Sequence, residues 1–254
     1  MKESILPVSP VPPRIQAPER PRREVAINQI AALWDSMIGK KVVMAITGAV
    51  LVLFVIMHMI GNLKILSGPD NINAYAVFLR EVGRPELGYG QLLWIVRIIL
   101  LICVILHVTA VIQLTRMNQV ARPVAYNVKK SLRTTIAAQT MRCGGVVLLA
   151  FIIFHLLHLT AGAVGFRPGQ FKHLAVYQNV IAGLSSWPVA IFYIVAMAAL
   201  SMHLHHGIWS AFQTLGFNTS RNTRILQTLC RLIALAVFLG FVSVPVSVLA
   251  GWLR

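Results

Sequence analysis

Five long apolar runs constrain what this chain can fold into more than any other feature. The chain is 57% apolar and 12% charged, and its mean hydropathy is +0.74. Each run has roughly the 20 residues that cross a hydrocarbon layer of about 30 Å. Because backbone groups in lipid must bond internally, and because the runs lack the alternation of barrel strands, we expect helices. The sequence predicts an all-α integral membrane protein, a five-transmembrane-helix bundle, with spans at about 42–66, 91–115, 141–165, 187–213 and 225–250.

The formal net charge of +16 is concentrated between and before the apolar runs. Sixteen of the 23 lysines and arginines lie in residues 1–41, 116–142 and 221–231. Basic loops stay in the cytoplasm, so we expect a cytoplasmic N-terminus and an outer C-terminus. The charge is therefore a topology signal and not a nucleic-acid footprint, although part of it suits anionic lipid or an acidic soluble partner.

The residues before the first run divide into two segments. Residues 1–24 contain six prolines and few aromatic residues, which predicts a disordered arm. Residues 25–40 place apolar side chains at helical spacing, which favours an amphipathic helix at the cytoplasmic membrane surface. No signal peptide is expected. Residues 41–254 then form the membrane domain.

Two connections face the outer side in this topology. Within residues 67–90 an apolar face at helical spacing predicts a short helix, capped by Asp70 or Asn71, that covers the outer end. Residues 166–186 are expected to form a loop with about one turn of helix.

Each of the first four runs carries a histidine well inside it. Ionisable side chains at that depth are costly, face the bundle interior and mark functional sites. Imidazole is also the commonest metal ligand among side chains. The sequence therefore predicts two bis-histidine haem sites in a four-helix core, with the ligands His58, His107, His155 and His203.

Depth pairs the four histidines. His58 lies about 25 Å along its helix from Lys41, and His155 lies about 20 Å from Arg142, at 1.5 Å per residue. Both therefore belong to the outer half. The second and fourth helices run in the opposite direction.

The other two histidines fall in the inner half. His107 lies about 13 Å from Arg116, and His203 lies about 15 Å from Gln213. Depth thus pairs the histidines of the first and third runs as an outer site, and those of the second and fourth runs as an inner site.

Neighbouring histidines leave part of this assignment open. His158 and His206 follow His155 and His203 by three residues and share their helix faces. Small residues beside a ligand give room for a flat macrocycle. Gly61 and Gly207 do so for His58 and His203, but Gly162 favours His158 instead. The residues alone thus prefer His203 but do not choose between His155 and His158. His173 and His205 are expected to be non-ligands.

The spacing of the three cysteines offers no covalent attachment site for haem. Cys103, Cys143 and Cys230 form neither a CxxC pair nor a CxxCH attachment sequence. Haem is therefore expected to be non-covalent, and no iron–sulfur cluster is built by this chain. We expect all three cysteines to be buried as small apolar residues.

Two runs of residues carry a family resemblance. The third span has Arg142-Cys-Gly-Gly145 followed by His155, and the fourth has Phe192-Tyr-Ile-Val195 followed by His203, Gly207-Ile-Trp-Ser210 and Leu215-Gly216. In these motifs, over about residues 40–250, the chain resembles the diheme cytochrome b membrane-anchor subunit of succinate dehydrogenase. The resemblance is to the single-chain, five-helix form of succinate:menaquinone oxidoreductases.

This resemblance has several implications. It makes His58, His107, His155 and His203 the axial ligands of two haem b groups, and so selects His155. It implies a flavoprotein subunit and an iron–sulfur subunit as partners, a membrane quinone such as menaquinone as acceptor, and a bacterial inner (cytoplasmic) membrane as location. A homo-oligomer of the whole complex is compatible with it.

Other residues are candidates for holding haem propionates or quinone. Propionates need cationic partners near the membrane faces. The candidates are Lys41, Arg133 and Arg142 on the inner side and Arg84 and Arg97 on the outer side. A quinone carbonyl needs a hydrogen-bond donor and a titratable group. The candidates are Asn62, Tyr75, Glu81, Glu86 and Tyr89.

Two other functions remain open at this point. One is the cytochrome b subunit of a different respiratory oxidoreductase. The other is a haem-free transporter that uses intramembrane histidines. None of the seven acidic residues lies deep in a span, which disfavours the transporter.

Overall fold

The computed structural model describes residue 32, residues 34–121 and residues 136–254. All regular structure in these residues is helical, and five helices are long and apolar enough to cross a membrane. They are α2 (Met37–Leu63), α4 (Gln91–Val120), α5 (Ile136–His155), α7 (Trp187–Thr214) and α8 (Thr223–Leu249). The predicted all-α class and the five spans are confirmed, and the chain is a multi-pass membrane protein.

The predicted disordered arm lies outside the described residues, as does half of the predicted surface helix. The last residues of that segment, 37–40, form the first turn of α2. The Ser36 hydroxyl caps this turn, since it accepts a hydrogen bond of 2.9 Å from the Gly39 amide.

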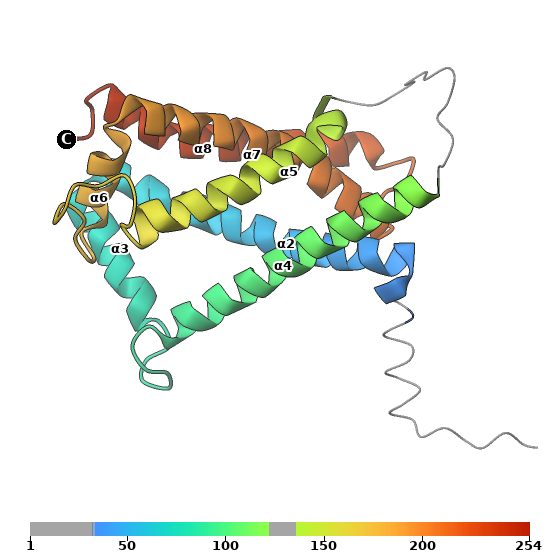
Figure 1. Ribbon diagram of the computed structural model, residues 1–254, viewed down its shortest axis with the longest axis horizontal. Coiled ribbons are helices and arrows are strands. Elements are labelled where there is room, and N and C mark those ends of the chain that lie inside the picture. The colour runs from blue at the N-terminus through green and yellow to red at the C-terminus, as the bar shows by residue number, and fades with distance from the viewer. Residues whose placement is uncertain (1–31, 33, 122–135) are drawn as a thin grey trace, which may run out of the picture.

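The spanning helices pack unequally. α7 packs against α8, α5 and α2, and α2 packs in addition against α4 and α8. α4 and α5 make little or no contact with each other in the described part of the chain, although both extend from one end of the bundle toward the other (Figure 1). The share of buried residues is highest in α7 and α8 and lowest in α2 and α4. Small residues on α7, namely Ala190, Ala196 and Ala199, are buried and let the neighbouring backbones approach closely.

Two short helices gather at one end of the bundle, together with the C-terminus (Figure 1). They are α3 (Pro69–Glu81), which follows a 3₁₀ turn at Lys64–Ser67, and α6 (Val176–Leu184). We call this the lid end. The start of α2 and the end of α4 lie at the opposite end.

The predicted lid helix exists, but its cap was misplaced. α3 begins at Pro69, and Gly68, with φ of 98°, is the N-cap in place of Asp70 or Asn71. Proline suits the first helical position because its missing N–H has no intrahelical partner there, so the helix starts earlier than predicted. Asn71 instead donates to the Ser67 carbonyl at 2.8 Å.

The second connection contains more helix than the predicted single turn. Tyr177, Gly183 and Leu184 of α6 are buried against the bundle, so apolar burial stabilises nine residues of helix. Its N-terminus is also capped from outside, because the Asn73 side-chain oxygen accepts a hydrogen bond of 3.1 Å from the Tyr177 amide. This bond joins the two lid helices.

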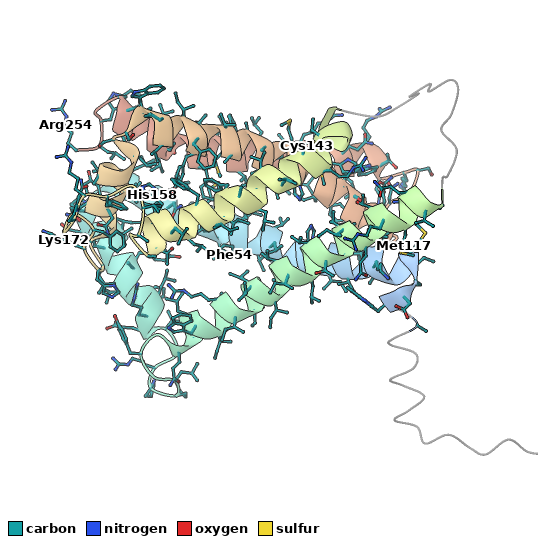
Figure 2. The ribbon with its side chains drawn as sticks, viewed as in Figure 1. Phe54, Met117, Cys143, His158, Lys172 and Arg254 are labelled. Atoms are coloured by element: carbon teal, nitrogen blue, oxygen red, sulfur yellow. The ribbon has the colours of Figure 1, made fainter. Side chains whose placement is uncertain are left out.

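The cysteine prediction is correct for Cys103 and Cys230, which are buried, and wrong for Cys143, which is exposed. Cys143 lies near the start of α5, at the end away from His158 (Figure 2), and its side chain is exposed. A residue of an apolar run can point outward as well as into the bundle, so its place in the run does not by itself bury the thiol.

α5 changes its winding at its lid end. The α-helix ends at His155 and continues as a π-helical turn, Leu156–Thr160. Single π turns inside helices are rare and frequent at functional sites. This turn contains His158, and it sets how His155 and His158 are placed relative to α7.

Candidate functional site

The structure brings the four intramembrane histidines together in two pairs. The ring centroids of His58 on α2 and His155 on α5 are 5.9 Å apart, with the planes at 79°. Those of His107 on α4 and His203 on α7 are 6.3 Å apart, with the planes at 57°. These are the same pairs that helical depth gives from the sequence. Each pair joins two helices, and all four rings are half-buried.

The spacing of both pairs fits one metal ion between two rings. Imidazole nitrogens lie about 2 Å from a bound metal, so rings on opposite sides of one ion have centroids about 6 Å apart. Each pair offers two imidazoles, and no group of three or more His, Cys, Asp or Glu side chains that could hold a metal ion occurs among the described residues. A haem iron with four ring nitrogens of its own needs two.

The two sites lie at different levels of the membrane. Thr47, which contacts His107, precedes His58 by 11 residues on α2, a rise of about 16 Å. On α7, Tyr193, which contacts His155, precedes His203 by ten residues, or about 15 Å. We call His58/His155 the lid-side site and His107/His203 the far site.

Hydrogen bonds hold one nitrogen of a ring in each site. Thr47 Oγ1 donates to the Val43 carbonyl at 2.7 Å, so its lone pairs are free to accept from His107 Nδ1, 3.3 Å away. Tyr193 Oη lies 3.3 Å from His155 Nδ1. Metal-bound histidines are normally fixed in this way through the nitrogen that does not bind the metal. In His107 and His155 this leaves Nε2 for a metal.

The other two rings are held differently. His203 Nδ1 is buried and has no hydrogen-bond partner among the described residues. His58 Nε2 is 3.5 Å from Asn62 Nδ2, at the limit of a hydrogen bond. His58 must give up this weak contact before its Nε2 can bind a metal.

Aromatic rings line the lid-side site. Phe54 stacks on His58 with centroids 5.3 Å apart, and Phe151 stacks on His155 at 5.7 Å. Phe241 of α8 reaches His58 at 5.9 Å. These rings give the site apolar walls and offer flat faces to a macrocycle.

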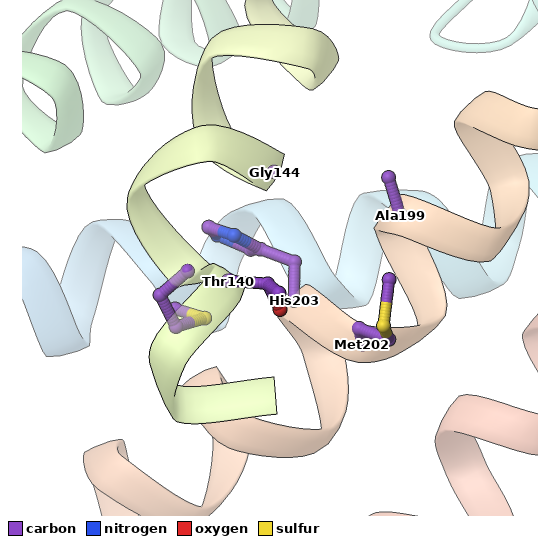
Figure 3. A pocket seen from close by; sticks show the side chains of 6 residues that line it. Thr140, Gly144, Ala199, Met202 and His203 are labelled. Carbon is purple, nitrogen blue, oxygen red and sulfur yellow. The ribbon is translucent and has the colours of Figure 1, made fainter. Parts of the chain in front are cut away.

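The far site is bounded by small residues. Figure 3 shows the His203 side chain extending from α7 toward the turn of α5 that carries Thr140 and Gly144, where it borders a small hollow. A β-carbon at Gly48 would lie 3.3 Å from His107 Cε1, and one at Gly145 would lie 4.0 Å from His203 Cε1. Sequence reasoning did not name Gly48, and it quoted Gly145 only as part of the Arg142 motif, not as a neighbour of His203. Gly48 was accessible to it, because it lies at nearly the depth of His107.

The two glycines that the sequence singled out have different surroundings. Gly207 faces open space, with nothing within 4 Å of a β-carbon built on it. A β-carbon at Gly61 would instead lie 2.6 Å from Tyr75 Cε1 of α3. Gly61 thus packs against the lid, whereas Gly207 leaves room beside the far site.

The structure separates the roles of His155 and His158. His155 faces His58, whereas His158 is fully buried, stacks on Phe166 at 5.1 Å and lies 2.9 Å from Tyr193 Oη through its Nδ1. His173 is exposed in the loop before α6, and His205 and His206 are half-buried.

The basic candidates lie at both ends. Lys41 is exposed, whereas its neighbour Lys40 is buried and donates to the Trp34 carbonyl. Arg97 is half-buried and its guanidinium lies 4.9 Å from the centroid of the Trp94 ring.

Arg142 is exposed and lines a polar hollow away from the lid end. Its neighbours there are Thr115, Asn118 and Gln119 of α4. Arg133 lies outside the described residues. This hollow offers a guanidinium and several amides to an anionic group.

The quinone candidates do not form one site. Asn62 touches His58, and Tyr75 packs under Gly61 with Lys64 Nζ 5.4 Å from its ring centroid. The remaining quinone candidates are exposed in or near the loop after α3: Glu81, Glu86 and Tyr89. The propionate candidate Arg84 is exposed in the same loop.

Comparison with protein-family models, with curated proteins and with solved structures finds no significant match.

Proposed function

We propose that this chain is the diheme cytochrome b membrane anchor of a succinate dehydrogenase, of the succinate:menaquinone oxidoreductase type. The observation that carries the proposal is the pair of facing imidazoles at each of two membrane levels, drawn from four different helices. The choice of complex rests on the resemblance of the third and fourth spans to that family.

Each site has a defined set of protein groups for a b haem. His58 and His155 hold the lid-side group, and His107 and His203 hold the far one. Bound there, haem would supply one-electron redox chemistry. Thr47 and Tyr193 hold one ligand ring in each site, and the stacked phenylalanines give the lid-side rings apolar neighbours.

The proposed activity is electron transfer between soluble partner subunits and a membrane quinone. The positive-inside pattern puts the end of the bundle away from the lid in the cytoplasm, where the iron–sulfur and flavoprotein subunits dock. Arg142 and its polar neighbours at that end suit the propionates of the far haem or an acidic partner surface. Menaquinone is the proposed quinone, and a bacterial inner membrane is the proposed location.

The facing histidine pairs also suit the cytochrome b subunit of another respiratory oxidoreductase. Succinate dehydrogenase is preferred because the Arg142 and Phe192 motifs resemble its anchor. The soluble subunits that co-purify with the chain decide between the two. A flavoprotein with succinate-dependent dye reduction supports the preferred complex, and a molybdenum or nickel enzyme contradicts it.

Haem content tests the proposal directly. The purified membrane complex is expected to give a b-type spectrum on dithionite reduction and two haems per chain by the pyridine-haem method. His58→Ala and His203→Ala should each remove one haem, and a different one. His205→Ala, on the same helix as His203, should remove none. A colourless wild-type complex refutes the proposal.

A further inference from the structure

The Tyr193 hydroxyl on α7 lies between two histidines of the third span: His155, where α5 ends, and His158, in the π-helical turn that follows. Its Oη is 3.3 Å from His155 Nδ1 and 2.9 Å from His158 Nδ1. Tyr193 is 8% exposed and His158 is fully buried, among apolar side chains. Water therefore does not compete for these hydrogen bonds, and such buried networks are stronger than exposed ones.

The direction of the hydrogen bonds follows from the proposed function, on which this inference rests. A histidine that binds iron through Nε2 carries its remaining proton on Nδ1. His155 then donates to Tyr193 Oη. The tyrosine hydroxyl has one proton of its own, which it donates to His158 Nδ1. The neutral His158 ring keeps its proton on Nε2.

His158 is held in a fitted position at the end of this chain. A β-carbon at Gly183 would lie 2.7 Å from His158 Nε2, and one at Gly165 would lie 2.6 Å from its Cδ2. Gly165 also has φ of 79°, a conformation that other residues rarely adopt. Phe166 covers the ring face. The two glycines thus form a cradle for this imidazole.

His158 is therefore more than a packing residue. Its Nε2 is buried without a hydrogen-bond partner among the described residues, a cost that a leucine at this position would avoid. Its other nitrogen makes the shorter of the two bonds to Tyr193. The π turn between His155 and His158 lets both rings reach one hydroxyl on α7.

We propose that Tyr193 and His158 are positioning residues for His155, and that they lower the reduction potential of the lid-side haem. A hydrogen bond accepted from Nδ1–H increases electron donation by the imidazole, which stabilises ferric over ferrous iron. The bond that Tyr193 donates to His158 makes its oxygen a better acceptor.

The test is a redox titration of both haems in the full complex. Each absorption band is first assigned to its site with the His58→Ala and His203→Ala variants. Tyr193→Phe, which removes one oxygen and keeps the ring, should raise the midpoint potential of the lid-side haem and leave that of the far haem unchanged. Tyr177→Phe is the matched control, since Tyr177 is buried in the same apolar cluster; it should change neither potential.

A second variant keeps the test independent of Tyr193. His158→Ala keeps the Tyr193 oxygen but removes the ring nitrogen that accepts its hydrogen bond. This variant should raise the midpoint potential of the lid-side haem by less than Tyr193→Phe does. The shape of the ferric low-spin electron paramagnetic resonance signal should change at the lid-side haem only.

The outcomes separate this inference from the proposed function. Two haems with unaltered potentials in both variants overturn the inference alone, as do equal shifts of both haems, which indicate a general structural disturbance. A wild-type complex without haem overturns both.

Discussion

Replacing Gly61 with alanine should weaken the contact between the first span and the lid. A β-carbon there would lie 2.6 Å from Tyr75 Cε1 and 3.1 Å from Cζ, whereas ordinary contact begins at 3.4 Å. The ring must therefore retreat by about 0.8 Å. It is restrained by Phe78, stacked at 6.2 Å, and by Lys64 Nζ. Overpacking of such a contact costs about 1–3 kcal/mol.

Gly240→Ala is the matched control for this substitution. Both glycines lie inside spanning helices, so both variants gain the same helix propensity of about 1 kcal/mol. At Gly240 the new β-carbon would meet Sδ and Cγ of Met59 at least as closely, but this unbranched side chain can move aside by changing its rotamer, whereas the rigid Tyr75 ring cannot. Gly61→Ala should therefore unfold more easily than Gly240→Ala by about 1–3 kcal/mol.

The assay is unfolding in mixed micelles by a dodecyl sulfate titration, followed by circular dichroism. Equal or greater stability of Gly61→Ala refutes the packing argument. Haem content, measured on the same samples, distinguishes a substitution that disturbs protein packing from one that fills space needed by the cofactor. Nothing lies within 4 Å of a β-carbon built on Gly207, so Gly207→Ala meets no protein clash and is the variant expected to lose haem, from the far site.

Two further variants test single hydrogen bonds. Thr47→Val removes the oxygen that faces His107 Nδ1 and should weaken haem binding at the far site about 10–100-fold, as measured by haem titration, while the lid-side site is unaffected. Thr228→Val loses the same kind of threonine-to-carbonyl bond at an exposed position of α8, a helix that carries none of the four histidines, and should change nothing. If both variants bind haem equally well, Thr47 does not support the ligand. Asn73→Ala leaves the Tyr177 amide without its acceptor, which should cost about 1–3 kcal/mol and speed hydrogen exchange in α6. The Asn71 side chain donates to the Ser67 carbonyl of the turn before α3, so Asn71→Ala should leave hydrogen exchange in α6 as it is. Equal exchange in the two variants contradicts the proposed link between the lid helices.

The spans were predictable because their cause is simple. Twenty apolar residues in a row have no alternative to a membrane helix, whatever their neighbours are. The ends were less predictable. α2 begins at Met37 and α4 continues to Val120, each about five residues beyond the predicted apolar run. Helices need no apolar residues once they leave the hydrocarbon layer, so hydropathy underestimates their length.

The two lid helices differ in how far the sequence predicts them. The apolar spacing of α3 was visible in the sequence, but α6 depends on partners elsewhere in the chain. Its N-terminal amide is capped by Asn73, about a hundred residues earlier, and its apolar face is buried only once the bundle exists. A nine-residue segment has little helical tendency by itself, so tertiary contacts decide its structure.

In the candidate sites, the sequence predicts the depth of each histidine but not the direction of its side chain. The depth of a residue in a spanning helix follows from a fixed rise per residue, so it is known before folding. The direction in which the side chain points depends on how each helix is rotated and which neighbours it meets. Depth was enough to pair the four histidines, because each pair is formed across the bundle at one level. It could not choose between His155 and His158, which differ by less than one turn, nor show that Gly61 faces Tyr75. A π turn changes that rotation further, and it carries no sequence signature in this chain. With this turn in place both rings reach Tyr193, but only His155 also faces His58, so the hydrogen bonds around the lid-side site could be found only in the structure.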